Sequence, residues 1–130
     1  MGEAARPTAL VVEDDEEIAY LLTFLLEKEG YAVTVARDGE AARGIIAAGA
    51  PPAVVTLDYM LPHFNGLELL EIMRANTAWQ DVPVVMLTAR SQQKDKSRAR
   101  EFGATAYLVK PFKPEELRAC IRTLTGARPA

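Results

Sequence analysis

Five short apolar runs alternate along the chain with five stretches whose apolar residues follow helical spacing. The runs predict strands over residues 8–12, 31–36, 53–58, 82–88 and 106–110, and the stretches predict helices over residues 16–29, 39–48, 67–76, 92–102 and 114–125. The first run is apolar without alternation, as in a strand that is buried on both faces. Regular alternation of strands and helices favours right-handed crossovers, and so an α/β fold with a parallel sheet and helices on both faces.

Length and composition fit one domain of this kind. At 130 residues, 49% of them apolar, the chain can build one core, and we expect a domain over residues 8–125 between tails at residues 1–7 and 126–130. The net charge of -3 gives no basic field for nucleic acid. No apolar run approaches the roughly 20 residues that cross a bilayer, and the N-terminus lacks a signal-peptide centre. We therefore expect a cytoplasmic domain that binds neither membranes nor nucleic acid directly.

Acidic, hydroxyl and amine side chains stand at the ends of four predicted strands. They are Glu13, Asp14 and Asp15 after the first strand, Asp58 at the end of the third, Thr88 at the end of the fourth and Lys110 at the end of the fifth. Parallel strands place their C-terminal ends at one edge of the sheet, where ligands bind in such folds. These groups are therefore expected to meet in one crevice.

The acids at this edge need a partner of opposite charge. Two carboxylates about 4 Å apart repel by roughly 4 kcal/mol at an effective dielectric constant of 20. Oxygen ligands without histidine or cysteine suit a hard cation such as Mg²⁺. A carboxylate beside a metal, here Asp58, can then act as a nucleophile toward phosphorus.

Each of these residues taken alone has an ordinary structural explanation. Asp15 is the acid that best fits a helix N-cap or a solvent-facing side chain. Asp58 is a common turn starter, Thr88 an unremarkable polar strand end and Lys110 a typical surface lysine. Only their joint placement at the strand ends predicts a site for a cation and a phosphoryl group.

The chain resembles the receiver domain of bacterial two-component response regulators over residues 8–125. The motifs that carry the resemblance are VVEDD at residues 11–15, LDYMLP at residues 57–62 with Gly66, LTA at residues 87–89, and Tyr107 with KPF at residues 110–112. The resemblance implies a flavodoxin-like (βα)5 fold, doubly wound, with five parallel strands in the order 2-1-3-4-5.

The resemblance also implies roles for the site residues. Asp58 would accept a phosphoryl group, and Mg²⁺ would be held by Asp14, Asp58 and the main-chain carbonyl of Met60, with Glu13 acting through water. The phosphoryl group would contact Thr88 and Lys110, and the Lys110–Pro111 bond is typically cis in this family. Such a domain is not an enzyme beyond accepting a phosphoryl group and slowly losing it.

A switch and its partners are implied in the same way. Thr88 would move toward the phosphoryl oxygens and Tyr107 would swing inward, which changes the surface of the fourth helix, fifth strand and fifth helix. The donor would be a sensor histidine kinase or a phosphotransfer protein. A phosphorylation-linked homodimer through this surface could use a Lys96–Glu116 ion pair. The other charged positions of that dimer pattern hold Thr105, Ala106 and Cys120, so the dimer mode stays open.

Some positions depart from the family pattern. Glu13 replaces the more frequent Asp, and Asn65 precedes Gly66 where Asp is common, in a loop predicted over residues 61–66. His63 in that loop is interpreted as a surface residue. Met60 and Arg90 occupy positions that tune the phosphoryl lifetime in the family. Because the Met60 side chain has no group that orients water, we expect hydrolysis that is not especially fast.

Three other functions compete with this interpretation. A pseudo-receiver that binds partners without phosphorylation would lack an acid, the threonine or the lysine, and all are present. An aspartate-based phosphatase needs a second Asp where Met60 stands. A flavodoxin needs a phosphate-binding loop after the first strand, and here that loop is acidic. The sequence does not name the kinase, the output or the pathway, nor whether the domain stands alone or is a fragment of a longer regulator.

Overall fold

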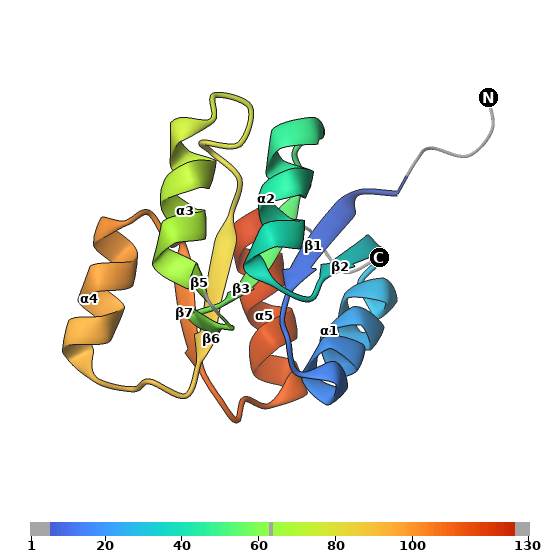
Figure 1. The fold of residues 1–130 in the computed structure, drawn as a ribbon. Coiled ribbons are helices and arrows are strands. Elements are labelled where there is room, and N and C mark those ends of the chain that lie inside the picture. Colours follow the sequence, from blue (N-terminus) through green and yellow to red (C-terminus); the bar gives the residue numbers. More distant parts are fainter. Residues whose placement is uncertain (1–5, 63, 127–130) are drawn as a thin grey trace, which may run out of the picture.

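Five parallel strands form the central sheet of the protein, in the order β2-β1-β3-β6-β7 (Figure 1). The structure is a computed structural model that describes residues 6–62 and 64–126. The strands are β1 (Thr8–Val12), β2 (Ala32–Ala36), β3 (Val54–Asp58), β6 (Val84–Thr88) and β7 (Ala106–Val109). Because β6 and β7 are the fourth and fifth strands of this sheet along the chain, the predicted order 2-1-3-4-5 is confirmed.

Helices cover both faces of the sheet, as the doubly wound class requires. They are α1 (Glu16–Lys28), α2 (Gly39–Ala48), α3 (Gly66–Ala75), α4 (Gln93–Glu101) and α5 (Pro114–Thr125). Leu22 of α1 and Leu117 of α5 pack into a core on one face, and Ile46 of α2 and Leu70 of α3 pack into a core on the other. Figure 1 shows α2 and α3 in front of the sheet and α5 behind it.

The predicted elements agree closely with the observed ones. The largest difference in a boundary is at β6, which was expected from residue 82 and begins at Val84. Every residue of the central strand β3 is buried, which explains why its sequence before Asp58 is apolar apart from Thr56. Asp58 is the last residue of β3, so the fold places one carboxylate at the end of a strand that is buried throughout.

The loop predicted over residues 61–66 is wrong in one respect, because part of it forms a small antiparallel ribbon. Its strands are β4 (Met60–Leu61) and β5 (Phe64–Asn65). The ribbon is closed by a hydrogen bond of 2.7 Å from the Gly66 amide to the Tyr59 carbonyl. It also rests on α2, because the Phe64 ring fills the space that a Cβ on Gly39 would need.

The limits of the described residues bear on two predictions. Most of the predicted tails at residues 1–7 and 126–130 lies outside the described residues, as does His63. Within the part of the chain that is described, no helix combines the length and apolarity needed to span a bilayer.

Candidate functional site

The strand ends bring the predicted acids together. Glu13 follows β1 and is fixed by a hydrogen bond of 3.0 Å from its amide to the Ala36 carbonyl. Asp58 ends β3 in register with Leu87 of β6. One carboxylate oxygen from each of Glu13, Asp14 and Asp58 lies within 4.8 Å of the other two. The edge of the sheet therefore carries a three-carboxylate cluster.

The cluster is partly shielded from water. Glu13 is 1% exposed and Asp58 8% exposed, whereas Asp14 faces solvent. Burial raises the pKa of Glu13 above its usual value, the hydrogen bond from Lys110 opposes that rise, and the negative charge of Asp58 adds to it. Oxygen ligands of this kind, with one acid open to solvent, fit a hard divalent cation that keeps part of its water shell.

Lys110 provides the positive charge of the site. Its Nζ donates to Glu13 Oε1 at 3.0 Å and to Asp58 Oδ2 at 3.2 Å. Burial disfavours the charged ammonium group, but the hydrogen bond to Glu13 and the charge of Asp58 outweigh it and raise the pKa of Lys110. The Lys110–Pro111 peptide bond is cis, as the resemblance implied. Lys110 is therefore a fixed cation beside the carboxylate that is expected to react.

Thr88 and Tyr107 both connect to Arg90. The Thr88 hydroxyl accepts a hydrogen bond of 3.1 Å from the Arg90 amide, and Tyr107 donates its hydroxyl to the Arg90 carbonyl at 3.0 Å. Burial, followed by the charges of Asp95 and Tyr59, raises the pKa of Tyr107 to about 12. Tyr107 is half-buried and is held by its hydrogen bond to the segment that follows Thr88.

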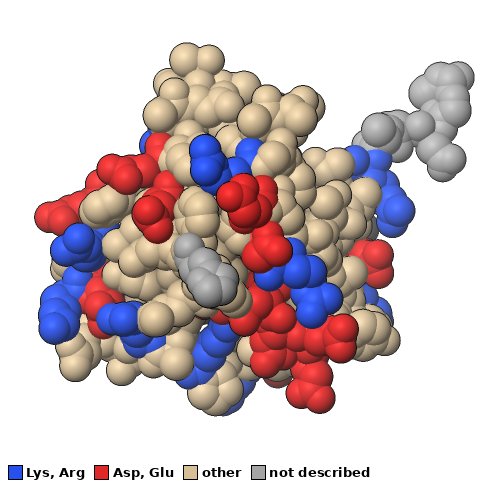
Figure 2. Space-filling view, viewed as in Figure 1, with Lys and Arg blue, Asp and Glu red and all other residues tan. Residues whose placement is uncertain are grey.

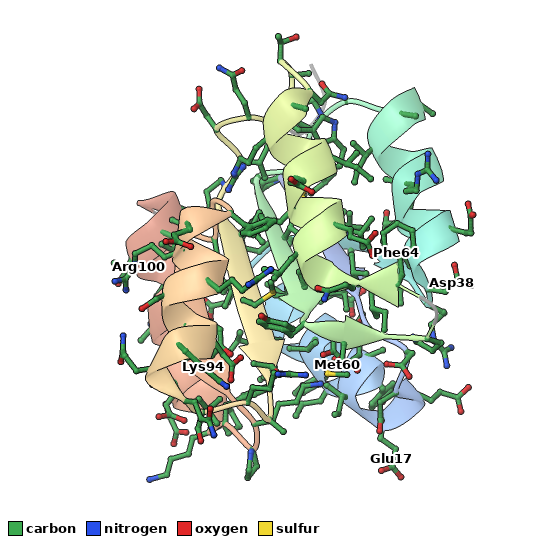
Figure 3. All side chains as sticks on the ribbon, turned by 60° about the vertical axis from the view of Figure 1, so that its left-hand side comes forward. Glu17, Asp38, Met60, Phe64, Lys94 and Arg100 are labelled. Atoms are coloured by element: carbon green, nitrogen blue, oxygen red, sulfur yellow. The ribbon has the colours of Figure 1, made fainter. Side chains whose placement is uncertain are left out.

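Met60 and Asp15 have structural roles beside the acids. The Met60 amide donates to Asp58 Oδ1 at 3.1 Å, which orients the carboxylate, and the Met60 side chain is exposed. In Figure 3, Met60 lies between Glu17 at the start of α1 and Lys94 in the first turn of α4. Asp15 is the N-cap of α1, because its Oδ1 accepts from the Ile18 amide at 3.0 Å. The interpretation of Asp15 as a cap is confirmed.

The site contains one residue that sequence analysis did not consider. Asp95 lies in the first turn of α4, is 8% exposed, and pairs with Arg90 at 3.4 Å. An acid in the first turn of a helix is common, so the sequence held no signal that this one is buried.

Comparison with known proteins identifies the family. A sequence profile described as the response regulator receiver domain matches residues 9–122. The chain belongs to the response regulator receiver domain family. Receiver domains of response regulators are signalling domains, and the sequence-based assignment is thereby confirmed.

Two relatives show the closeness of the match. The receiver domain is 39% identical over 116 residues to the phosphate regulon transcriptional regulatory protein PhoB of Klebsiella pneumoniae, covering 88% of this chain and 50% of PhoB. It is 40% identical over 120 residues to the DNA-binding response regulator MtrA of Mycobacterium tuberculosis, covering 92% of this chain and 51% of MtrA. The chain thus spans about half the length of these relatives.

Solved structures show the same fold. A putative response regulator from Chloroflexus aurantiacus aligns with a TM-score of 0.87 at 32% identity, covering 95% of this chain and 100% of that one. The receiver domain of the sensor histidine kinase PA1611 from Pseudomonas aeruginosa aligns with a TM-score of 0.84 at 29% identity, over 95% and 100% of the two chains. That structure is described with a magnesium ion coordinated in its active site cleft.

Proposed function

We propose that this domain is a phosphorylation-dependent switch in which Asp58 accepts a phosphoryl group from a sensor histidine kinase or a phosphotransfer protein. The observation that carries the proposal is the meeting of three carboxylates with the Lys110 ammonium group at the end of the central strand. In the transfer, an Asp58 carboxylate oxygen bonds to phosphorus while the bond from phosphorus to the donor nitrogen breaks.

The acids are suited to hold Mg²⁺ at this place. Asp14, Asp58 and the main-chain carbonyl of Met60 would be its protein ligands, and Glu13 would act through water. Bound Mg²⁺ neutralises charge on the oxygens of the transferred group. The solvent-facing Asp14 leaves room for the waters that Mg²⁺ retains.

Lys110 and Thr88 would contact the phosphoryl oxygens. The phosphoryl group of an aspartyl phosphate carries roughly -1.5 to -2 units of charge, more than the single negative charge of the free carboxylate. Lys110 already bonds Asp58 Oδ2, so a short movement would bring its Nζ to the new oxygens. The Thr88 hydroxyl would give up its present bond from the Arg90 amide and turn toward the same oxygens. Tyr107 would then swing inward.

The surface formed by α4, β7 and α5 would change with it, and this would alter its binding to an output domain or partner. Tyr107 lies on β7, and its bond to the Arg90 carbonyl joins that surface to the Thr88 segment. A groove of about 400 Å³ beside Lys110, lined by Ile18, Leu21, Pro111 and other apolar groups, suits the docking of the donor protein. A homodimer through the α4, β7 and α5 surface is part of the proposal.

One observation favours a second candidate, a pseudo-receiver that binds partners without phosphorylation. Lys110 pairs with both Glu13 and Asp58, so its single positive charge offsets part of the negative charge of these two acids without any metal. In that case the Asp58 carboxylate would be a structural partner of Lys110, and Asp58→Asn would leave every function of the domain intact.

Labelling with a small phosphodonor separates the two candidates. The protein is incubated with acetyl phosphate and Mg²⁺, and the modified residue is mapped by peptide mass spectrometry. We expect one phosphoryl group on Asp58, none on Asp58→Asn, and none after chelation of the metal. A wild-type chain that stays unlabelled with Mg²⁺ present would support the pseudo-receiver.

A further inference from the structure

Arg90 is held at three points at the rim of the site. Its Nε and Nη2 both donate to Met60 Sδ at 3.2 Å, and its Nη1 donates to Asp95 Oδ1 at 3.4 Å. The guanidinium carbon lies 5.2 Å from the centroid of the Tyr59 ring. A thioether is a weak acceptor and a ring offers no net charge, so Asp95 supplies the full charge that fixes the guanidinium group.

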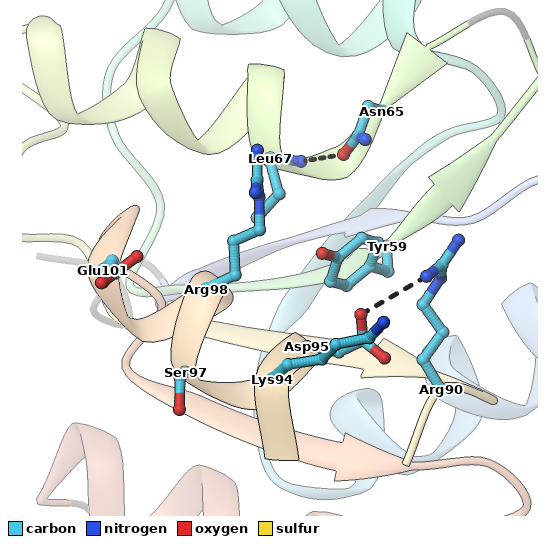
Figure 4. A pocket seen from close by; sticks show the side chains of 9 residues that line it. All are labelled: Tyr59, Asn65, Leu67, Arg90, Lys94, Asp95, Ser97, Arg98 and Glu101. Carbon is cyan, nitrogen blue, oxygen red and sulfur yellow. Dashed lines mark hydrogen bonds and ion pairs between the residues drawn. The ribbon is translucent and has the colours of Figure 1, made fainter. Parts of the chain in front are cut away.

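Asp95 itself depends on this contact. Its side chain is 10% exposed, and among the described residues Arg90 is the only cation within ion-pair distance. A shielded carboxylate without a partner is costly, so the pair holds both side chains in place. Figure 4 shows Arg90, from the segment between β6 and α4, joined to Asp95 of α4 at a groove that the Tyr59 ring also lines.

Met60 connects this pair to the phosphoacceptor. Met60 stands two residues after Asp58, and its amide is bonded to Asp58 Oδ1 at 3.1 Å. Met60 is 57% exposed, so it borders the side of the site that water reaches. The Arg90 guanidinium group lies against the Met60 sulfur and adds bulk at that border.

We propose that Asp95 is a positioning residue that holds Arg90 against Met60 and thereby slows the attack of water on phosphorylated Asp58. In that reaction, the water oxygen bonds to phosphorus as the bond from phosphorus to the Asp58 oxygen breaks. The products are the free carboxylate and dihydrogen phosphate. This inference rests on the proposed function and adds a residue of α4 to the control of the phosphoryl lifetime.

It follows that the position of α4 controls the lifetime of the aspartyl phosphate. Any change that draws Asp95 away from Arg90 frees the guanidinium group from the rim and opens the approach of water to phosphorus. The lifetime then depends on a helix that buries only Asp95 and Ala99. The sequence positions that tune the lifetime, Met60 and Arg90, are thus coupled to a third residue.

The test follows the decay of the aspartyl phosphate. Wild type, Asp95→Asn, Arg90→Ala and the double variant are labelled with acetyl phosphate, freed of donor and followed by intact mass at constant Mg²⁺. We expect the aspartyl phosphate of Asp95→Asn to be hydrolysed about fivefold faster than that of wild type. A change of this size corresponds to the loss of one partly exposed ion pair. The double variant should decay no faster than Arg90→Ala, because Asp95 acts through Arg90. Asp95→Glu should restore a slow decay.

Lys94→Gln is the matched control, since Lys94 is an exposed neighbour on the same helical turn. The aspartyl phosphate of Lys94→Gln should decay at the wild-type rate. A second measurement needs no phosphorylation: in protein with ¹³C-methyl methionine, Asp95→Asn should shift the Met60 methyl resonance, and Lys94→Gln should not. A Met60 resonance that stays in place in Asp95→Asn would overturn the positioning role.

The outcomes separate this inference from the proposed function. A wild-type chain that takes no label overturns the proposed function and the lifetime effect with it. An Asp95→Asn protein that labels normally on Asp58 and decays at the wild-type rate overturns the role of Asp95 alone. So does a double variant whose decay rate is the product of the two single effects.

Discussion

Gly66 approaches the backbone of Asp58, the proposed phosphoacceptor, and of Tyr59 more closely than a residue with a Cβ could. A Cβ at this position would lie 2.5 Å from the Asp58 carbonyl oxygen and 3.0 Å from the Tyr59 Cα. Both are backbone atoms, so they cannot rotate away as a side chain would. The glycine is therefore required by proximity to Asp58, which gives a physical reason for its place in the motif.

Gly66→Ala should displace Asp58 from its position at the site. We expect the rate of labelling by acetyl phosphate to fall about tenfold or more, because small misplacement of reacting groups is costly. Overpacking should also lower the free energy of unfolding by roughly 1–3 kcal/mol. Gly44→Ala is the control, because a Cβ at Gly44 in α2 would extend into open space. It should label normally and gain about 0.5–1 kcal/mol of stability in urea unfolding.

Thr56 offers a prediction about stability at the same scale. Its hydroxyl is buried in β3 and has no hydrogen-bond partner in the described part of the chain. Thr56→Val replaces the hydroxyl by a methyl group of similar shape, so we expect the free energy of unfolding to rise by about 1 kcal/mol. Thr34→Val on the exposed side of β2 should change it little. A Thr56→Val protein that unfolds at lower urea than wild type would show that the hydroxyl is satisfied.

The residues of the site were predictable to different degrees. Asp58, Thr88 and Lys110 could be found because strand ends share one edge in a parallel sheet, a rule that needs no side-chain detail. Asp95 could not, because its burial depends on how α4 lies against its neighbours. Arg90 was recognised by its position, but its contact with the Met60 sulfur follows from rotamers that no sequence pattern specifies.

At the scale of elements, α1 and α5 are joined by an ion-pair clamp. Glu29, the C-cap residue of α1, accepts from Arg118 at 3.1 Å and from Arg122 at 2.7 and 3.0 Å. The hydrogen bond from Arg122 is the main cause that lowers the pKa of Glu29, against a smaller opposing effect of burial. The clamp holds together the two helices that cover one face of the sheet.

Glu29→Gln should weaken this clamp in a way that depends on pH. A carboxyl whose folded-state pKa is lowered stabilises the fold above its unfolded-state pKa and loses that effect as pH falls through the folded value. At neutral pH the variant should lose up to about 1 kcal/mol of stability. The difference in the free energy of unfolding between the variant and wild type should vanish in acid. Urea unfolding at a series of pH values from neutral to acid measures it. Glu27→Gln, an exposed neighbour in α1, should show neither effect.

The boundaries of the elements could be predicted from the sequence wherever a glycine or proline marks the end or the start of a helix. Gly30 with φ of 99° lies just beyond α1, and Pro114 opens α5. The β4–β5 ribbon was missed because each of its strands has only two residues, too few for an alternating pattern to appear. Its existence depends on contacts made elsewhere, with Gly39 and with the Tyr59 carbonyl.

Charge is unevenly distributed over the whole molecule. Acidic side chains gather at the lower right of the face in Figure 2, where α1 begins, and basic side chains lie on the left, over α4. The net charge of -3 conceals this asymmetry. Within α4 alone, Lys94, Lys96, Arg98 and Arg100 outnumber Asp95 and Glu101. A second copy that brings acids to α4 would find an attractive surface.

The proposed homodimer can be tested by exchange of one charge pair. Phosphorylated wild type should elute as a dimer in size exclusion with light scattering, and the unphosphorylated protein as a monomer. Lys96→Glu should abolish the dimer, and Lys96→Glu with Glu116→Lys should restore it, because the pair would re-form with reversed signs. Glu116 also accepts from the Lys113 amide at 2.7 Å, so the stability of each variant is measured separately. A dimer that forms equally without phosphorylation would contradict the switch.

The pairing of the buried central strand bears on which parts of the protein can move when Asp58 is modified. β3 is paired along its length with β1 on one side and β6 on the other. Amide deuterium exchange in such a strand requires opening of the sheet, so we expect it to be equally slow before and after Asp58 is modified. The proposed acceptor, Asp58, thus stands at the end of a buried strand that is paired on both sides. We therefore expect new charge at Asp58 to leave the backbone of β3 in place and to move only the loops and side chains that surround it.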